Sequence, residues 1–196
     1  MVIPINYRKS AEGSIASYDY FDIAEGTGIL TLYGATTTTG AILTKNIVYS
    51  TTIEESGAGS APSQTFELSP FNLPKIISGT AYINVTMEAD SVSTPYTAYL
   101  VFQFYKNSDT LGSATSGAVL TAASEYKTGL YSVAIPETNF KKGDVLKLEV
   151  TMVDSASNGH LAWGHDPKNR DGTYITPTTT ETTTQLVVNV PFKIDI

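Results

Sequence analysis

Apolar and polar residues alternate along much of the chain, which is the pattern of β-strands that bury one face. From Ile77 to Ala89 the odd-numbered residues are apolar or small, and most even-numbered residues between them are polar. Residues 145–153 alternate in the same way, and the longest alternation covers residues 186–196. The sequence therefore predicts three well-defined strands in these places.

Further strands are expected between clusters of Gly, Pro, Asn, Asp and Ser. Residues 97–105 are apolar on both faces, which predicts a central strand that is covered on both sides. Shorter candidates lie at residues 17–23, 28–34, 41–53, 64–68, 130–135 and 160–164. No window of ten residues has a helical stripe, and the loops are too short for crossover helices, so we expect mainly antiparallel pairing.

We therefore predict an all-β chain, an antiparallel β-sandwich of two sheets, with a jelly roll as the favoured topology. About eight to ten strands fit a jelly roll, whereas seven would fit an immunoglobulin-like sandwich. The length of 196 residues suits one domain, which we place at residues 15–196 after an N-terminal arm at residues 1–14. The Gly/Ser-rich residues 54–63 and the Thr-rich residues 177–184 are expected to be loops.

Charge and composition exclude several classes of partner. The net charge is −7 and the basic residues form no stripe, so we expect no nucleic-acid partner. The chain contains no cysteine, which excludes disulfides and thiolate chemistry. The first residues do not have the pattern of a signal peptide, and no apolar run approaches the length of a membrane span. We expect no membrane partner, and synthesis in the cytoplasm.

Residues 160–172 contain both histidines, the only tryptophan and one of the two arginines. His160, Trp163, His165, Asp166 and Arg170 are therefore the candidates for a ligand-binding loop. The alternative is a polar turn after a strand, because Asp-Pro and Asp-Gly pairs both favour turns.

Metal binding at the same residues is disfavoured. Imidazole and carboxylate groups suit zinc, but His165 and Asp166 are adjacent and would point to opposite faces of a strand. A calcium loop fails because Pro167 stands where the first aspartate ligand is needed. We predict no metal ion and no cofactor.

Known catalytic patterns are missing from the sequence. There is no Gly-x-Ser-x-Gly elbow, no phosphate loop and no dinucleotide fingerprint. Glu54 and Glu55 are adjacent, but we expect both carboxylates to be solvated. We therefore predict that the chain is not an enzyme. Its many tyrosines, together with Trp163, leave a carbohydrate-binding module or a receptor-binding tip as the alternative function.

Three stretches of the sequence together form a recognisable pattern. An aromatic residue, Phe140, precedes Gly143-Asp144 and an alternating strand, and residues 164–171 and 189–196 complete the pattern. The combination resembles jelly-roll virion proteins of tailed bacteriophages, of the head decoration or minor capsid type. This resemblance implies a virion structural protein that decorates or cements the capsid. It also implies a location in the virion, major capsid protein or other virion proteins as partners, and a homo-oligomer, with a trimer favoured.

The N-terminal arm is a candidate contact with the capsid or with a neighbouring subunit, and the alternative is a frayed terminus. Its apolar and basic residues would make the contact: Val2, Ile3, Ile5, Tyr7 and Arg8.

Overall fold

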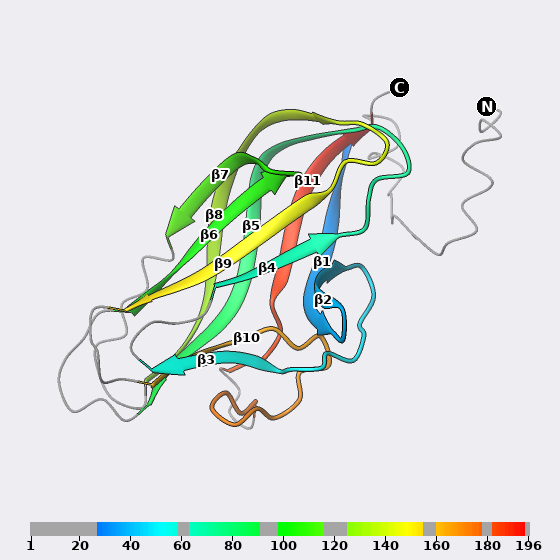
Figure 1. The fold of residues 1–196 in the computed structure, drawn as a ribbon. Coiled ribbons are helices and arrows are strands. Elements are labelled where there is room, and N and C mark those ends of the chain that lie inside the picture. Colours follow the sequence, from blue (N-terminus) through cyan, green and yellow to red (C-terminus); the bar gives the residue numbers. More distant parts are fainter. Residues whose placement is uncertain are drawn as a thin grey trace.

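The computed structural model describes residues 27–58, 63–90, 98–115, 125–154, 160–177 and 182–194 (Figure 1). Eleven strands lie in these ranges: β1 (Thr27–Thr37), β2 (Gly40–Thr44), β3 (Glu54–Ala58), β4 (Ser63–Leu68), β5 (Lys75–Asp90), β6 (Ala98–Lys106), β7 (Asp109–Thr115), β8 (Glu125–Phe140), β9 (Leu146–Asp154), β10 (His160–Gly164) and β11 (Val187–Ile194). The described residues contain no helix, so the prediction of an all-β chain is confirmed.

Four antiparallel strand pairs nest inside one another along the chain. β1 pairs with β11, β4 with β9, β5 with β8, and β6 with β7. This is the order of one long hairpin that has been rolled up. Pairing of β5 with β11 and of β6 with β9 completes two sheets, β8-β5-β11-β1 and β4-β9-β6-β7. The predicted jelly-roll sandwich is therefore confirmed.

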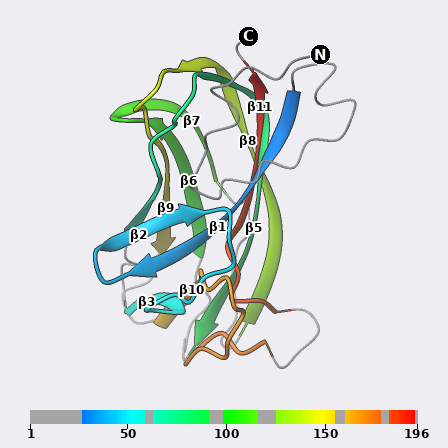
Figure 2. The same cartoon turned by 90° about the vertical axis from the view of Figure 1, so that its right-hand side faces the viewer.

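The strand β1 takes part in both sheets and turns the corner between them. Its residues 27–33 pair with β11, and its residues 33–37 pair with β2. β2 in turn pairs with β4 in parallel over only two residues, Ile42 and Leu43. Figure 2 shows the two layers edge-on, with the β1-β2 hairpin crossing between them.

The two sheets also meet on the opposite side, where β7 lies beside β8. A Cβ placed on Gly112 of β7 would overlap the backbone carbonyl oxygen of Ala134 in β8. Glycine is needed here because the two backbones approach so closely. The contact covers edges that would otherwise be open to pairing with another chain.

Inward-facing side chains from both sheets form a single core. Leu32 of β1 and Ile83 of β5 face Phe66, Phe102 and Leu148 of the other sheet, and all are fully buried. They occupy every second position of their strands, because alternation of side chains places one set between the sheets. The alternating segments of the sequence therefore supply the core, as predicted.

Two segments differ from the predicted strands for local reasons. The expected strand at residues 41–53 ends at Thr44, and the chain then returns so that Thr36 donates its backbone N–H to the hydroxyl of the buried Ser50. The expected loop at residues 54–63 contains β3, which pairs with β10 despite its Gly and Ser content.

Three further strands differ from the prediction in length, in existence or in how far they are buried. β8 runs for 16 residues around the short segment that was predicted, and β7 was not predicted at all. β6 is not covered on both sides, because its outward side chains, such as Tyr99 and Val101, are only half-buried. The expected strand at residues 17–23 and the arm at residues 1–14 lie outside the described residues, so both stay predictions.

Candidate functional site

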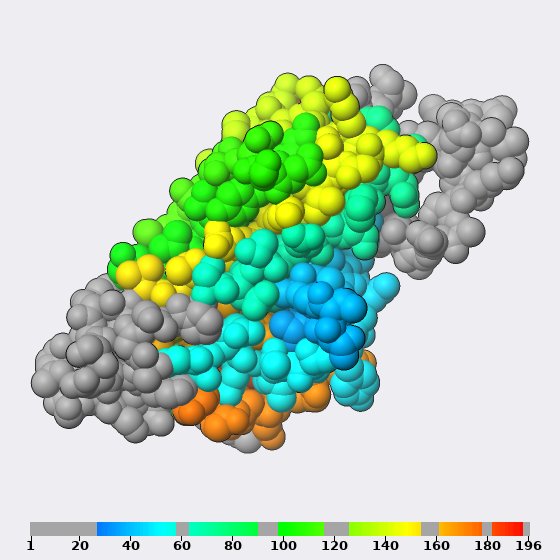
Figure 3. All heavy atoms as spheres, viewed as in Figure 1, coloured from blue at the N-terminus to red at the C-terminus, as the bar shows by residue number. Residues whose placement is uncertain are grey.

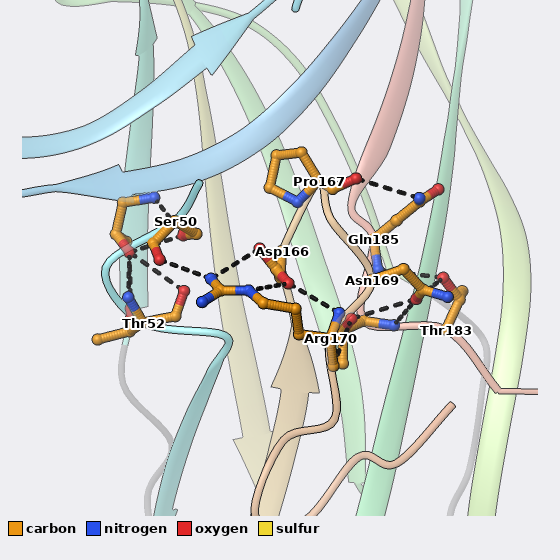
Figure 4. A network of polar contacts seen from close by, with 10 residues as sticks. Ser50, Thr52, Asp166, Pro167, Asn169, Arg170, Thr183 and Gln185 are labelled. Carbon is orange, nitrogen blue, oxygen red and sulfur yellow. Dashed lines mark hydrogen bonds and ion pairs between the residues drawn. The ribbon is translucent and has the colours of Figure 1, made fainter. Parts of the chain in front are cut away.

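The predicted ligand-binding loop follows β10 and is held by an ion pair (Figure 4). Arg170 donates to both carboxylate oxygens of the fully buried Asp166, from Nε at 3.0 Å and Nη2 at 3.1 Å. Burial raises the pKa of Asp166, but the hydrogen bonds and charge of Arg170 outweigh it and lower the pKa overall. Arg170 also donates to the carbonyl oxygen of Ser50 at 2.6 Å, so the pair ties this loop to the segment before β3.

A second set of contacts joins the same loop to the segment that leads into β11. Asn169 is in the left-handed region with φ of 50°, and its Oδ1 accepts the hydroxyl of Thr183 and the backbone N–H of Thr184, each at 2.7 Å. Gln185 donates to the carbonyl oxygen of Pro167 at 3.2 Å. The Thr residues before β11 therefore act here as hydrogen-bonding partners of the loop.

The carboxylates of Glu54 and Glu55 are not simply solvated, which corrects the prediction. Glu54 accepts three backbone N–H groups in the loop after β10, those of Thr173, Tyr174 and Ile175, at 2.8 to 3.0 Å. An Oε1 of Glu55 lies 3.2 Å from Nε2 of the fully buried His165. The hydrogen bonds of Glu54 hold the loop after β10 against β3.

The aromatic residues of the predicted loop belong to the core. Trp163 and His165 are fully buried and pack against Phe66, with ring centroids 5.9 and 5.6 Å from the phenyl ring. The backbone of His160 pairs with Ala58 of β3 and Asp90 of β5. An external ligand has no access to Trp163, His165 or Asp166. Ligand binding by this loop stays a prediction, now confined to Arg170 and its exposed neighbours.

The structure bears differently on the predicted absence of a metal site and on the predicted contact residues of the N-terminal arm. Among the described residues, no group of three His, Asp or Glu side chains could hold a metal ion. The proposed contact residues of the arm, Val2, Ile3, Ile5, Tyr7 and Arg8, lie outside the described ranges.

A different candidate site is the outer surface of the sheet β8-β5-β11-β1. The strand register places its outward residues in rows across the four strands. We call this surface the charge-free face and define it by Ile29, Thr31, Tyr33, Thr80, Tyr82, Asn84, Leu130, Ser132, Ala134, Val187, Asn189 and Pro191. One row runs from Leu130 through Asn84 and Val187 to Tyr33. The next row includes Tyr82 and Asn189. None of the twelve residues is Asp, Glu, Lys or Arg. The ion pair of Lys193 in β11 with Glu137 in β8 lies at one end of the same sheet, outside the face so defined.

Large apolar side chains are exposed on the charge-free face. Leu130 is 67% exposed, Ile29 is 63% exposed and Tyr82 is 47% exposed. Tyr126 extends the same face along β8, so four of the six large hydrophobic residues that are exposed in the described part of the chain lie on this sheet. Single exposed apolar residues are ordinary, but a cluster on one face marks an interaction surface.

Figure 3 shows the molecule from the side of the other sheet, β4-β9-β6-β7. The outer surface of this sheet differs in the chemistry of its side chains. Its polar groups bind one another: Lys147 pairs with Glu67, and Glu149 accepts hydrogen bonds from Tyr105 at 2.6 Å and from Ser63 at 2.8 Å. We call it the charged face. None of the exposed large hydrophobic residues in the described part of the chain lies on it.

Sequence reasoning missed the charge-free face, although the sequence contains a signal for it. No Asp, Glu, Lys or Arg occurs in residues 27–44, 76–87, 128–136 or 182–192. These four segments supply β1, the middle of β5 and β8, and most of β11. The signal becomes visible only when the topology places the four segments side by side.

Comparisons with known proteins support the fold. No protein-family model matches the chain, and no curated protein matches it. An α-amino acid ester hydrolase has a similar structure, with a TM-score of 0.55 and 10% identity, over 84% of this chain and 36% of that chain. An aminopeptidase from a marine sediment archaeon, Thaumarchaeota archaeon, has a TM-score of 0.54 and 8% identity, over 85% of this chain and 37% of that chain. The chain therefore spans little more than a third of either enzyme, and at such identities the likeness shows the fold alone.

A third similar structure is VP2 of infectious bursal disease virus, in a subviral particle. Its TM-score is 0.36 and its identity is 11%, over 86% of this chain and 41% of that chain. This similarity is too low to support an inference about the chain.

The comparisons contradict the prediction that the chain is not an enzyme. The two similar structures described above with a TM-score above 0.5 are hydrolytic enzymes. A jelly roll of this kind also occurs as one part of larger enzymes. The absence of a familiar catalytic motif is therefore no evidence against an enzyme. Among the described residues, no helix is long and apolar enough to cross a membrane.

Proposed function

We propose that this chain is an assembly protein that binds other protein subunits through its charge-free face. The observation that carries the proposal is the concentration of exposed Leu130, Ile29 and Tyr82 on the part of one sheet surface that has no Asp, Glu, Lys or Arg side chain. Depletion of charge and enrichment of aromatic residues distinguish the centres of protein interfaces from ordinary surface. Tyr33 and Tyr82 supply the aromatic contacts, and the Thr and Asn residues between them can form hydrogen bonds across an interface.

The more specific proposal is a virion structural protein, which contacts the shell of a viral head as a decoration, cement or minor capsid protein. The acidic charge and the missing cysteines fit a protein that is made in many copies in a reducing cytoplasm. The resemblance of residues 140–150 to jelly-roll virion proteins of tailed bacteriophages supports the same proposal. In the structure, the Gly143-Asp144 part of this pattern is a loop in which Asp144 accepts the backbone N–H of Lys141 at 2.8 Å.

Quantitative mass spectrometry of purified viral particles tests the virion role. We expect this chain in a fixed ratio to the major shell protein, and we expect Leu130→Glu to lower that ratio. Ser113→Glu is the matched control, because it adds the same charge to an exposed position on β7 of the other sheet. A chain that is abundant in infected cells but missing from the particles would refute the virion role.

A second candidate is a jelly-roll part of a hydrolase, favoured by the similarity to the two enzymes. In that case the charge-free face would contact the rest of the enzyme. The natural polypeptide would then migrate well above 21.0 kDa on an immunoblot. Purified protein of that length would hydrolyse α-amino acid esters or aminoacyl amides. A natural polypeptide of 21.0 kDa without such activity would exclude this candidate.

A further inference from the structure

We infer that the partner of the charge-free face is a second copy of this chain, so that two sheets β8-β5-β11-β1 pack face to face. The inference rests on the proposed function, because it identifies the partner of the same surface. Three properties of the described residues support it: the distribution of charge, the shape of the surface and the kind of polar groups on it.

Charge restricts where two copies can meet. Each chain has a net charge of −7, so two copies repel one another at most orientations. On the charged face, contact would also bury Glu67, Lys147 and Glu149, which already have partners within their own chain. Burial of charges costs more than their pairing returns unless the new geometry is excellent. Two copies can approach over the twelve residues of the charge-free face without this cost, and the Lys193–Glu137 pair stays at the rim of such a contact.

The face is the outer surface of a sheet, which can pack on a copy of itself. Sheets in β-sandwiches pack onto sheets about 10 Å apart, with strands aligned at about 30°. A contact of the face with itself is isologous and closes with two copies. The pair differs in this respect from the trimer that the resemblance to phage proteins implies.

The polar groups of the face can be satisfied by an identical surface. Asn84 and Asn189 each have a donor and an acceptor in the side chain, and so do Thr31, Thr80 and Ser132. Thr31 already donates its hydroxyl to Oδ1 of Asn189 at 2.9 Å, which is a hydrogen bond between β1 and β11 within one row. A partner with a strongly acidic or basic surface would find no counter-charge here.

The size of the face sets the expected affinity. Its twelve defining residues are fewer than the roughly 20 to 30 that each partner contributes to a stable interface. We therefore expect a dissociation constant of about 1 to 100 µM rather than an obligate dimer. Salt should strengthen the association, because it screens the repulsion between the two acidic copies.

Sedimentation equilibrium of the full chain over a range from about 1 to 300 µM tests the inference. We expect a monomer–dimer equilibrium that becomes roughly three- to tenfold tighter between about 0.02 and 0.5 M NaCl. Leu130→Glu should weaken the dimer at least about tenfold, since it replaces the most exposed apolar side chain of the contact by a carboxylate. Leu130→Lys should also weaken it, although this change reduces the net charge. Ser113→Glu should leave the dimer almost unchanged.

The possible results separate the inference from the proposed function. A monomer at all concentrations and salts would overturn the inference, while a loss of Leu130→Glu from viral particles would still support binding of another protein by the face. A dimer that Ser113→Glu weakens and Leu130→Glu does not would overturn both the inference and the proposed function.

A monomer whose Leu130 resists chemical labelling in the free chain would show that a segment of the same chain covers the face, which also overturns the inference. Thermal unfolding by circular dichroism must show that each variant is folded.

Discussion

The two sheets of this jelly roll have similar inner surfaces and very different outer surfaces. Inward residues such as Ile83 of β5 and Leu100 of β6 are fully buried in one core. On the outside, Glu149 and Lys147 of the charged face are bound by neighbours on their own sheet, whereas Leu130 and Tyr82 of the charge-free face are exposed. The inner surfaces supply the core of the sandwich. The exposed apolar side chains outside add nothing to that core, and this is why we propose that they bind a partner.

The first prediction concerns the inner surfaces, where the effects are largest. Ile83→Ala and Leu100→Ala should each lower the free energy of unfolding by about 2 to 5 kcal/mol, because both remove buried methyl groups and leave a cavity. Urea denaturation followed by circular dichroism measures both. If one of the two substitutions had almost no effect, the two sheets would not share one core, and the comparison of their outer surfaces would lose its basis.

The second prediction concerns the closure between the sheets. Gly112→Ala should lower the free energy of unfolding by about 1 to 3 kcal/mol, because its Cβ would overlap the carbonyl oxygen of Ala134. Ser113→Ala on the same strand is the control and should stay within about 0.5 kcal/mol of the parent chain. Equal stability of the two variants would mean that β7 and β8 do not approach as closely as described.

The third prediction concerns the loss of stability in acid, which should come from carboxylates outside the charge-free face. Hydrogen bonds from Asn107 and from the backbone N–H of Lys141 lower the pKa of Asp144 from 3.8 to about 2. Its contribution to stability is therefore complete above about pH 4 and is lost as the pH falls towards 2. The pKa of Glu149 is also lowered, mainly by the hydrogen bond from Tyr105. The charge-free face has no carboxylate that could respond.

Replacement of Asp144 by Asn removes the titrating group and tests this prediction. The parent chain should lose thermal stability between pH 4 and pH 2 more steeply than Asp144→Asn does. Parallel melting curves at pH 4, 3 and 2 measure the difference. Identical acid dependence of the two chains would show that the loop between β8 and β9 does not hold Asp144 as described.

The fold was predictable because alternation alone defines the strands that supply the core. β5 and β9 have regular alternation of apolar and polar residues. Because the loops are too short for crossover helices, antiparallel pairing of these strands with others was expected. β7 was not predictable, because Gly112, Ser113 and Ala114 have little apolar contrast. β3 was missed for the same reason. Its pairing depends on β10 and on the carboxylates of Glu54 and Glu55, which are contacts that are distant in the sequence.

The candidate site was harder to predict than the fold. The residue types in β10 and the loop after it predicted a ligand-binding site, yet Trp163, His165 and Asp166 are buried parts of the fold. In contrast, Leu130, Tyr82 and Ile29 come from three separate segments, and each looks ordinary in its own strand. Only the register between β8, β5, β11 and β1 places them on one surface. A site of this kind is a property of topology and is therefore hidden from local sequence patterns.

Hydroxyl-radical footprinting with mass spectrometry tests most directly that the charge-free face is the docking surface. The protein is labelled once in the assembly in which it occurs and once as the free, dilute chain. We predict that Leu130, Tyr82 and Ile29 are oxidised more slowly in the assembly, and that Tyr99 and Tyr105 of the charged face are oxidised at the same rate in both states. Protection of Tyr99 and Tyr105 with unchanged oxidation of Leu130, Tyr82 and Ile29 would contradict the account.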